Sequence, residues 1–282
     1  ELVAVFQEVR RVLRPDGTCW INLGDSYAND GKWGGHTGGK HVKALHCTPI
    51  GRNKRYTGLK PKDLIGVPWM VAFALRDDGW FLRRDIIWHK LNPMPESVRD
   101  RPSTAHEYLF LLTKAKTYAY DSDAILEPVS QNTHARLSQD VAAQVGSDRA
   151  NGSGKTNGNM KAVGRTPKTQ PAGHGIKNND SFAAACCLPV THRNKRSVWA
   201  TSTEAFSEAH FATLPPALIE PCILAGCPKG GIVLDPFGGA GTTGLVADRL
   251  GRNAILIEIN PEYAAMAERR IKSDAGMFAE VR

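Results

Sequence analysis

The chain has 282 residues, of which 41% are hydrophobic and 23% charged, and its formal net charge is +8. This length and composition suit one large α/β domain with a sizeable core and argue against intrinsic disorder as the main state. No apolar run approaches the roughly 18 to 20 residues that cross a bilayer, and no signal peptide opens the sequence. We expect a soluble cytoplasmic protein without membrane contacts.

The first half of the chain predicts helices and strands in alternation. Apolar residues recur at helical spacing over residues 1–13, and Pro15 begins the turn that ends this helix. The segment "TCWINLGD" predicts a buried strand, and a basic, Gly-rich loop leads from it to a helix over residues 68–76. The strands "WFLRRDIIWHK" and "HEYLFLLTK" follow, separated by a proline-rich loop that is too long for a tight hairpin turn.

The last third of the chain also alternates helix and strand. We expect Thr213 to cap a helix that has Pro215 and Pro216 in its first turn and ends at Gly226. The strand "IVLD", the helix "TTGLVADRL", the strand "NAILIEI" and a final helix from Asn260 come next. This alternation favours a parallel sheet with helices on its faces.

A basic insertion lies between these two parts. Between residues 130 and 200, ten Lys or Arg residues accompany three acidic residues, which gives +7 of the total +8. The window is also rich in Gly, Asn and Ser, so it predicts a mobile segment suited to phosphate contacts. A solvated loop without a partner has the same composition, and the sequence leaves that alternative open.

The six cysteines show no paired C-x-x-C spacing, so they predict neither a zinc site nor a disulfide framework. Cys222 and Cys227 fall in one predicted helix, where small buried thiols are the simplest interpretation. His41, His46 and Cys47 come nearest to a metal-ligand pattern, but no second ligand pair accompanies them. We expect no bound metal.

The glycine turn after "IVLD" is the most informative motif. The segment "GAGTTG" from Gly239 matches the dinucleotide pattern GxGxxG, and Glu258 lies where a ribose-binding acid is expected. Asp235, at the end of the first strand, argues against a dinucleotide because its carboxylate would repel a pyrophosphate. The same carboxylate would attract a ligand that carries an ammonium and a sulfonium group. S-adenosylmethionine is such a ligand.

Two longer segments resemble the DNA amino-methyltransferases, the enzymes that methylate adenine N6 or cytosine N4. The segments "DPFGGAGTT" and "GRNAILIEINPEYAAMAERR" resemble the cofactor half, and "DIIWHKLNPMPESVRDRPSTAHEYLFLLTK" resembles the target-base region of the beta-class members. The resemblance implies an α/β fold of the class I S-adenosylmethionine-dependent type, with a Rossmann-like sheet in permuted order and a basic, loop-rich insertion. It also implies three regions: a catalytic half at residues 1–129, a target-recognition insertion at 130–200 and a cofactor-binding half at 201–282.

By the same resemblance, the protein is expected to be a site-specific DNA methyltransferase of a restriction-modification system. It would transfer a methyl group from S-adenosylmethionine to the exocyclic amine of a base flipped out of double-stranded DNA. A restriction endonuclease is a candidate partner.

The resemblance and the strand ends together assign candidate site residues. The positions expected to bind the cofactor are Phe211, Thr213, Pro215, Asp235, Phe237, Gly239, Gly241, Thr242, Thr243, Glu258 and Asn260. The positions expected to line the target-base pocket are Asp25, Trp88, Lys90, Asn92, Pro93 and Met94. Arg193, Lys195 and Arg196 are expected to contact DNA.

The chain departs from the family in one motif. The family holds the target amine with a tetrapeptide of the type (Asp/Asn/Ser)-Pro-Pro-(Tyr/Phe), and "LPPA" from Leu214 has neither the polar first residue nor the aromatic last one. The sequence also opens without Met. We therefore expect a fragment, inactive alone, that lacks an N-terminal segment. We expect it to show five of the class's strands, with the slot between "IVLD" and "TCWINL" either empty or closed up.

Other functions remain open at this point. A nicotinamide-dependent oxidoreductase is supported by the GxGxxG match alone. A noncatalytic nucleic-acid-binding module is supported by the basic insertion alone. A methyltransferase that acts on RNA or on a small molecule would share the same fold.

Overall fold

The computed structural model describes residues 1–28, 58–129, 191–204 and 213–275. The chain divides into two compact units, one formed by Glu1–Ala124 with Arg196–Arg282 and the other by Ile125–Lys195. The described part of the second unit is one short antiparallel pair, β4 (Glu127–Pro128) with β5 (His192–Arg193). Most of the predicted insertion lies outside the described residues. The other described elements belong to the first unit.

A mixed four-stranded sheet organises the N-terminal part of the first unit. Its strands are β1 (Thr18–Leu23), β2 (Phe81–Lys90), β3 (His106–Thr113) and β6 (Val198–Thr201), in the order β1-β3-β2-β6. β3 is antiparallel to both β1 and β2, whereas β6 is parallel to β2. The sequence predicts β1, β2 and β3, but it does not predict β6, because "VWAT" is too short to show a strand pattern.

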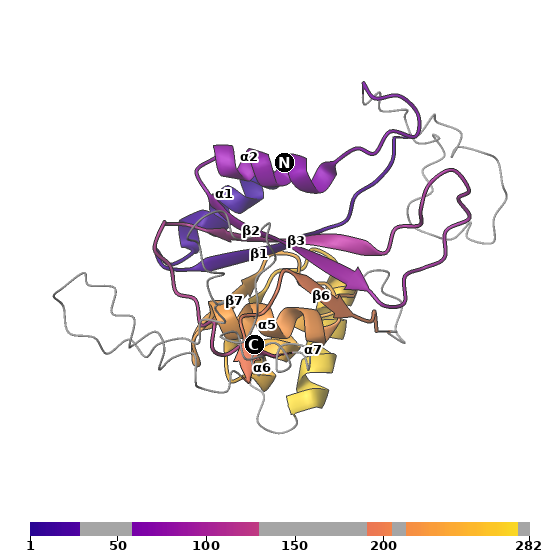
Figure 1. The fold of residues 1–282 in the computed structure, drawn as a ribbon. Coiled ribbons are helices and arrows are strands. Elements are labelled where there is room, and N and C mark those ends of the chain that lie inside the picture. The colour runs from indigo at the N-terminus through magenta and orange to yellow at the C-terminus, as the bar shows by residue number, and fades with distance from the viewer. Residues whose placement is uncertain (29–57, 130–190, 205–212, 276–282) are drawn as a thin grey trace, which may run out of the picture. The chain divides into compact units, whose positions relative to one another are not determined.

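Helices cover both faces of this sheet, as Figure 1 shows. On one face lie α1 (Leu2–Val12) and α2 (Val67–Asp77), and on the other lies α5 (Pro216–Gly226). Phe6 of α1 and Leu75 of α2 pack on Phe110 of β3 in one apolar cluster. Leu218 of α5 packs in a second cluster with strand residues that include Trp88 and Trp199.

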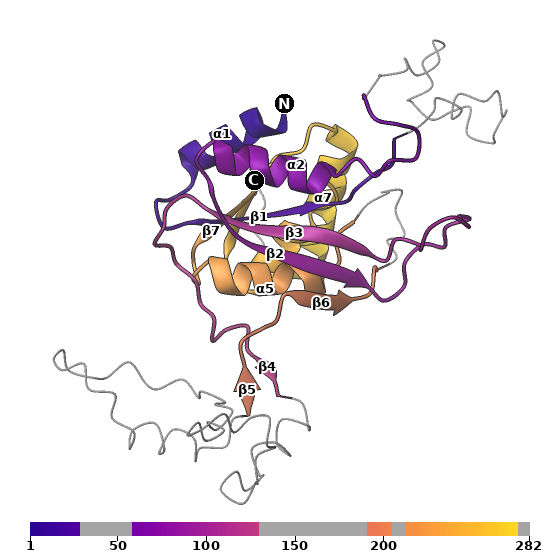
Figure 2. The ribbon, with the colours of Figure 1, turned by 45° about the horizontal axis from the view of Figure 1, so that its top comes forward.

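The C-terminal elements form a smaller parallel sheet with its own helices. β7 (Ile232–Asp235) pairs with β8 (Asn253–Leu256), and α6 (Thr242–Arg249) connects the two strands. α7 (Pro261–Ala275) follows and packs on α6, which also packs on α5. Figure 2 shows α5 alongside β6 of the larger sheet. This strand-helix alternation is the one that the sequence predicts. β8 ends at Leu256, so Glu258 lies just beyond the strand.

The predicted cap of α5 is wrong. The helix begins at Pro216, its N-cap is Pro215 in an extended conformation, and no side chain caps it. Proline has no backbone N–H. Pro215 and Pro216 therefore lack the N–H groups that would otherwise donate to the Thr213 hydroxyl. The predicted end of this helix at Gly226 is confirmed.

The two sheets of the first unit are separate. Among the described residues, the strands that pair with β7 and with β1 are β8 and β3 respectively, so β7 and β1 do not pair with each other. The slot between "IVLD" and "TCWINL" is therefore not closed by direct pairing, but the two sheets together have six described strands and not the expected five, because β6 adds to the edge of β2. The two parts of the unit meet through side chains, for example the rings of Phe6 and Phe237, whose centroids are 6.5 Å apart. In the described part of the chain, every helix is too short or too polar to cross a membrane.

Candidate functional site

The glycine turn between β7 and α6 joins the ends of two neighbouring strands. Gly239 and Gly241 have positive φ angles of 50° and 75°. The backbone N–H of Gly238 donates to the carbonyl of Ile257, just beyond β8, at 2.8 Å. A Cβ on Gly241 would lie 2.7 Å from the Cβ of Ala267 in α7, so the turn has no room for a side chain there.

Asp235 closes β7, and its carboxylate turns back onto the glycine turn. One oxygen accepts a hydrogen bond from the N–H of Phe237 at 2.9 Å. The other accepts from the Thr243 hydroxyl, in the first turn of α6, at 2.6 Å. The carboxylate thus lies at the N-terminus of a helix, where the backbone dipole favours negative charge.

Glu258 occupies the corresponding place after β8. Its Oε2 accepts from the N–H of Gly239 at 2.8 Å, and its Oε1 accepts from the N–H of Asn260 at 2.8 Å. Asn260 in turn caps α7, because its side-chain oxygen accepts from the N–H of Glu262 at 2.9 Å. Two oriented carboxylates therefore flank one turn in which glycines leave the backbone accessible. This arrangement suits a ligand with a cationic group and hydroxyl donors.

The other predicted cofactor residues are distributed around this turn or lie outside the described chain. Phe237 is 57% exposed and faces Phe6, and Thr242 is buried at the start of α6. Thr213 and Pro215 precede α5, and the Pro215 side chain is fully buried. Phe211 lies outside the described residues.

Asp25 has a structural partner that its sequence position does not indicate. Its Oδ1 accepts hydrogen bonds from the N–H groups of Gly66 at 2.9 Å and of Val67 at 3.0 Å, at the start of α2. Gly66 is the N-cap of that helix and has no polar side chain of its own. A distant carboxylate therefore caps α2 and ties it to the end of β1.

Trp88 and Lys90 lie at the end of β2. The Trp88 side chain is 2% exposed, packs in the cluster beneath α5 and donates its indole N–H to the carbonyl of Thr201 at 3.3 Å. This burial favours a role in packing over contact with a base. Lys90 forms a half-buried ion pair with Glu107 of β3, and its ammonium lies 4.7 Å from the centroid of the Trp88 ring.

The loop after β2 is anchored by the side chain of Asn92. Its Nδ2 donates to the carbonyl of Thr203 at 3.1 Å, and its Oδ1 accepts from the N–H of Thr203 at 2.7 Å. The amide thereby joins the two chain segments two residues beyond Lys90 and Thr201, the last pair of the parallel β2–β6 pairing. Met94, two positions further on, is 86% exposed, and Pro93 between them is half-buried.

The predicted DNA-contacting residues lie around β5 and β6. Arg193 forms an ion pair with Glu127 across the β4–β5 pair, at 2.8 Å. The backbone carbonyl of Arg196 accepts from the Trp199 indole at 2.7 Å, and the Lys195 side chain is half-buried. Nothing in this geometry identifies a DNA contact, so their role stays a prediction.

The described cysteines are free thiols. Burial raises the pKa of Cys19 to about 12 and also raises the pKa of Cys227. Among the described residues, no three His, Cys, Asp or Glu side chains are arranged to hold a metal ion. His41, His46 and Cys47 lie outside these residues.

Sequence reasoning missed three residues that shape the site. Glu107 pairs with Lys90, Thr203 receives the Asn92 amide, and Arg270 of α7 reaches the glycine turn. The partners are separated by 17, 111 and 30 residues respectively, so no local spacing could have indicated them.

Comparisons with known proteins identify the family of this chain. The sequence profile of the family N6_N4_Mtase, described as DNA methylase, matches residues 1–269. The type II methyltransferase M.SmaI from Serratia marcescens is 41% identical over 272 residues, which cover 96% of this chain and 73% of that protein. The type II methyltransferase M.Cfr9I from Citrobacter freundii is 38% identical over 273 residues, which cover 97% and 71%.

Solved structures share the fold at lower sequence identity. The PvuII DNA methyltransferase, which is specific for cytosine N4, is 17% identical with a TM-score of 0.53, over 97% of this chain and 75% of that one. A putative DNA modification methylase from Thermus thermophilus, in complex with S-adenosyl-L-methionine, is 21% identical with a TM-score of 0.52, over 98% and 77%. The expected class I methyltransferase fold is confirmed, and the chain belongs to the N6/N4 DNA methylase family, whose enzymes are S-adenosylmethionine-dependent DNA amino-methyltransferases.

Proposed function

We propose that the glycine turn binds S-adenosylmethionine, with Asp235 facing the methionine ammonium and Glu258 facing the ribose hydroxyls. The observation that carries this proposal is the pair of carboxylates at the ends of β7 and β8, each oriented by backbone amides of the turn. An ionised carboxylate offers about four acceptor positions, so each can still receive a ligand donor. A dinucleotide pyrophosphate would meet negative charge at the same place.

The proposed reaction is methyl transfer to an exocyclic amine of double-stranded DNA, at adenine N6 or cytosine N4. The amine attacks the methyl carbon in line with the sulfonium, the C–S bond breaks, and S-adenosylhomocysteine and a proton leave. Positioning of the two reactants supplies most of the rate enhancement. The target base must leave the stack, and that step requires a few kcal/mol.

We assign the recognition of the flipped base to the loop that Asn92 anchors, with Pro93 and Met94 on its accessible side. The Lys and Arg residues of the insertion at 130–200 are assigned to phosphate contacts. M.SmaI and M.Cfr9I are type II methyltransferases by name, so we also propose a restriction endonuclease partner that reads the same DNA site, with both proteins in the cytoplasm.

Isothermal titration tests the cofactor assignment without requiring turnover. The chain should bind S-adenosylmethionine and S-adenosylhomocysteine and should not bind NAD at comparable concentration. E258Q removes one charge while it keeps an amide oxygen in place, so it should weaken both adenosyl ligands. Binding of NAD without binding of either adenosyl ligand would contradict the proposal.

A further inference from the structure

Arg270 of α7 reaches across to the glycine turn. Its Nη1 donates to the backbone carbonyl of Ala240 at 3.1 Å and to the hydroxyl of Thr242 at 2.8 Å. Both acceptors belong to the segment that leads into α6. One guanidinium nitrogen therefore fixes the last part of the turn and the first residue of the helix.

The surrounding packing leaves the turn little freedom. Ala240 is 4% exposed and Thr242 is 6% exposed, so both Arg270 acceptors belong to residues that are nearly removed from water. Ala267, one helical turn before Arg270, packs against Gly241 so closely that a Cβ there would lie 2.7 Å away. If the Arg270 donor were absent, a buried carbonyl and a buried hydroxyl would lose their charged partner, a loss that favours rearrangement of the turn.

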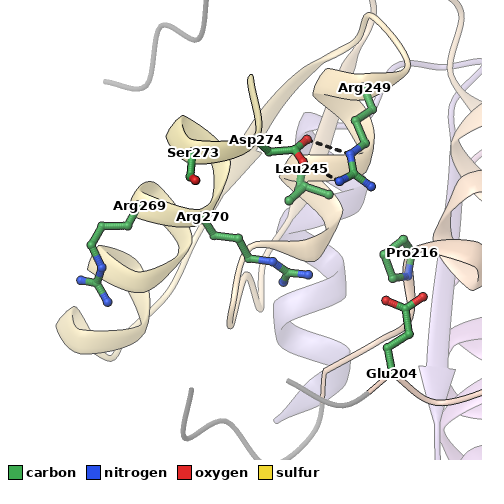
Figure 3. Close-up of a pocket in the computed structure, with 8 residues that line it drawn as sticks. All are labelled: Glu204, Pro216, Leu245, Arg249, Arg269, Arg270, Ser273 and Asp274. Carbon is green, nitrogen blue, oxygen red and sulfur yellow. Dashed lines mark hydrogen bonds and ion pairs between the residues drawn. The ribbon is translucent and has the colours of Figure 1, made fainter. Parts of the chain in front are cut away.

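Figure 3 shows the setting of this arginine in a groove of about 570 Å³. Arg249 in the same groove points to Asp274 of α7 and pairs with it at 2.7 Å. Arg269, the neighbour of Arg270 on the same helix, points in a different direction (Figure 3). The groove residues are Glu204, Pro216, Leu245, Arg249, Arg269, Arg270, Ser273 and Asp274.

We propose that Arg270 is a positioning residue for the cofactor: it acts through Ala240 and Thr242 to hold the glycine turn in the conformation that binds S-adenosylmethionine. The role rests on the proposed cofactor site, and Arg270 would act there through its hydrogen bonds to the turn. The turn also carries the N–H groups that orient Asp235 and Glu258. A displaced turn therefore misplaces both carboxylates.

Calorimetry on R270M tests this role, because methionine keeps an unbranched apolar stem and removes the donors. We expect the Kd for S-adenosylmethionine and for S-adenosylhomocysteine to rise about tenfold, the equivalent of about 1.4 kcal/mol, as for the loss of a charge-assisted hydrogen bond. R270K should recover part of the affinity, because its ammonium can reach one acceptor. R269M is the matched control and should leave both Kd values unchanged.

A double-mutant cycle separates positioning from a general loss of stability. T242V removes one acceptor, so it should weaken binding less in the R270M background than in the wild type. Unchanged affinity in R270M, an equal loss in R269M, or full additivity with T242V would overturn the proposal. If R270M does not fold, R270K takes its place in the cycle. In that case, a Kd for R270K equal to that of the wild type would overturn the proposal. Failure of the wild-type chain to bind either adenosyl ligand would instead refute the proposed function.

Discussion

Replacement of Gly241 by alanine should destabilise the fold through two separable effects. The residue has φ of 75°, and this left-handed conformation costs a residue with a Cβ about 1–2 kcal/mol. The added Cβ would lie 2.7 Å from the Cβ of Ala267 and 3.0 Å from its Cα, and such overpacking typically costs about 1–3 kcal/mol. G241A should therefore lower the free energy of unfolding by about 2–5 kcal/mol in total.

Gly251 supplies the matched control for this variant. Its φ is 70°, but nothing lies within 4 Å of the position that a Cβ would take. G251A should thus show the backbone effect alone, about 1–2 kcal/mol. Urea denaturation followed by circular dichroism measures both variants, with an unchanged slope as the sign that the unfolded state is not altered. Equal losses in the two variants would refute the argument that α7 presses on the turn.

Three further predictions concern the carboxylate, the anchored loop and the half-buried thiol of Cys19. D235N keeps an acceptor for the Phe237 N–H but loses the negative charge. Calorimetry should therefore show about tenfold weaker binding of S-adenosylmethionine, with little change in the free energy of unfolding. Unaltered affinity would argue against the electrostatic assignment. N92D loses the donor to Thr203, so DNA affinity measured by fluorescence anisotropy should fall while cofactor affinity stays constant, and the reverse result would show that the loop does not serve DNA. Because burial raises the pKa of Cys19 to about 12, its contribution to stability is complete below the ordinary thiol pKa and is lost as pH rises through the folded value. As the pH rises above about 8.5, the free energy of unfolding should therefore fall less in C19A than in the wild type, by up to about 1.4 kcal/mol per pH unit. Urea denaturation at several pH values measures this difference, and identical pH slopes would contradict it.

The glycine turn could be predicted from the sequence because its determinants are local. The strand that ends at Asp235, the positive-φ glycines and the short strand before Glu258 all fall within one continuous segment. The second strand ends two residues before Glu258, earlier than the sequence predicts. A helix end marked by glycine can also be predicted from the sequence, as the end of α5 at Gly226 shows.

The roles of several residues depend instead on contacts that no local pattern contains. Asp25 follows a strand in the manner of a ligand-binding acid, yet it caps α2, whose first residues lie about 40 positions later. Trp88 belongs to a strand whose pattern does not show which side chains are covered, yet it packs against residues of α5, which lies more than 100 residues later in the sequence. β6 pairs with β2 over a separation of more than 100 residues, so neither partner's sequence signals the pairing. In each case the tertiary contact decides the role.

The site owes its geometry to the turn more than to the carboxylates themselves. Asp235 and Glu258 are held by four hydrogen bonds, whose donors are Phe237, Gly239, Asn260 and the hydroxyl of Thr243. Carboxylates fixed in this way lose less side-chain freedom when a ligand arrives, which leaves more of the interaction energy for affinity. In the proposed site, cofactor binding would therefore also depend on the residues that hold the turn in place. Ala267 and Arg270 of α7 both contact the turn, so under our proposal both would influence cofactor affinity through it.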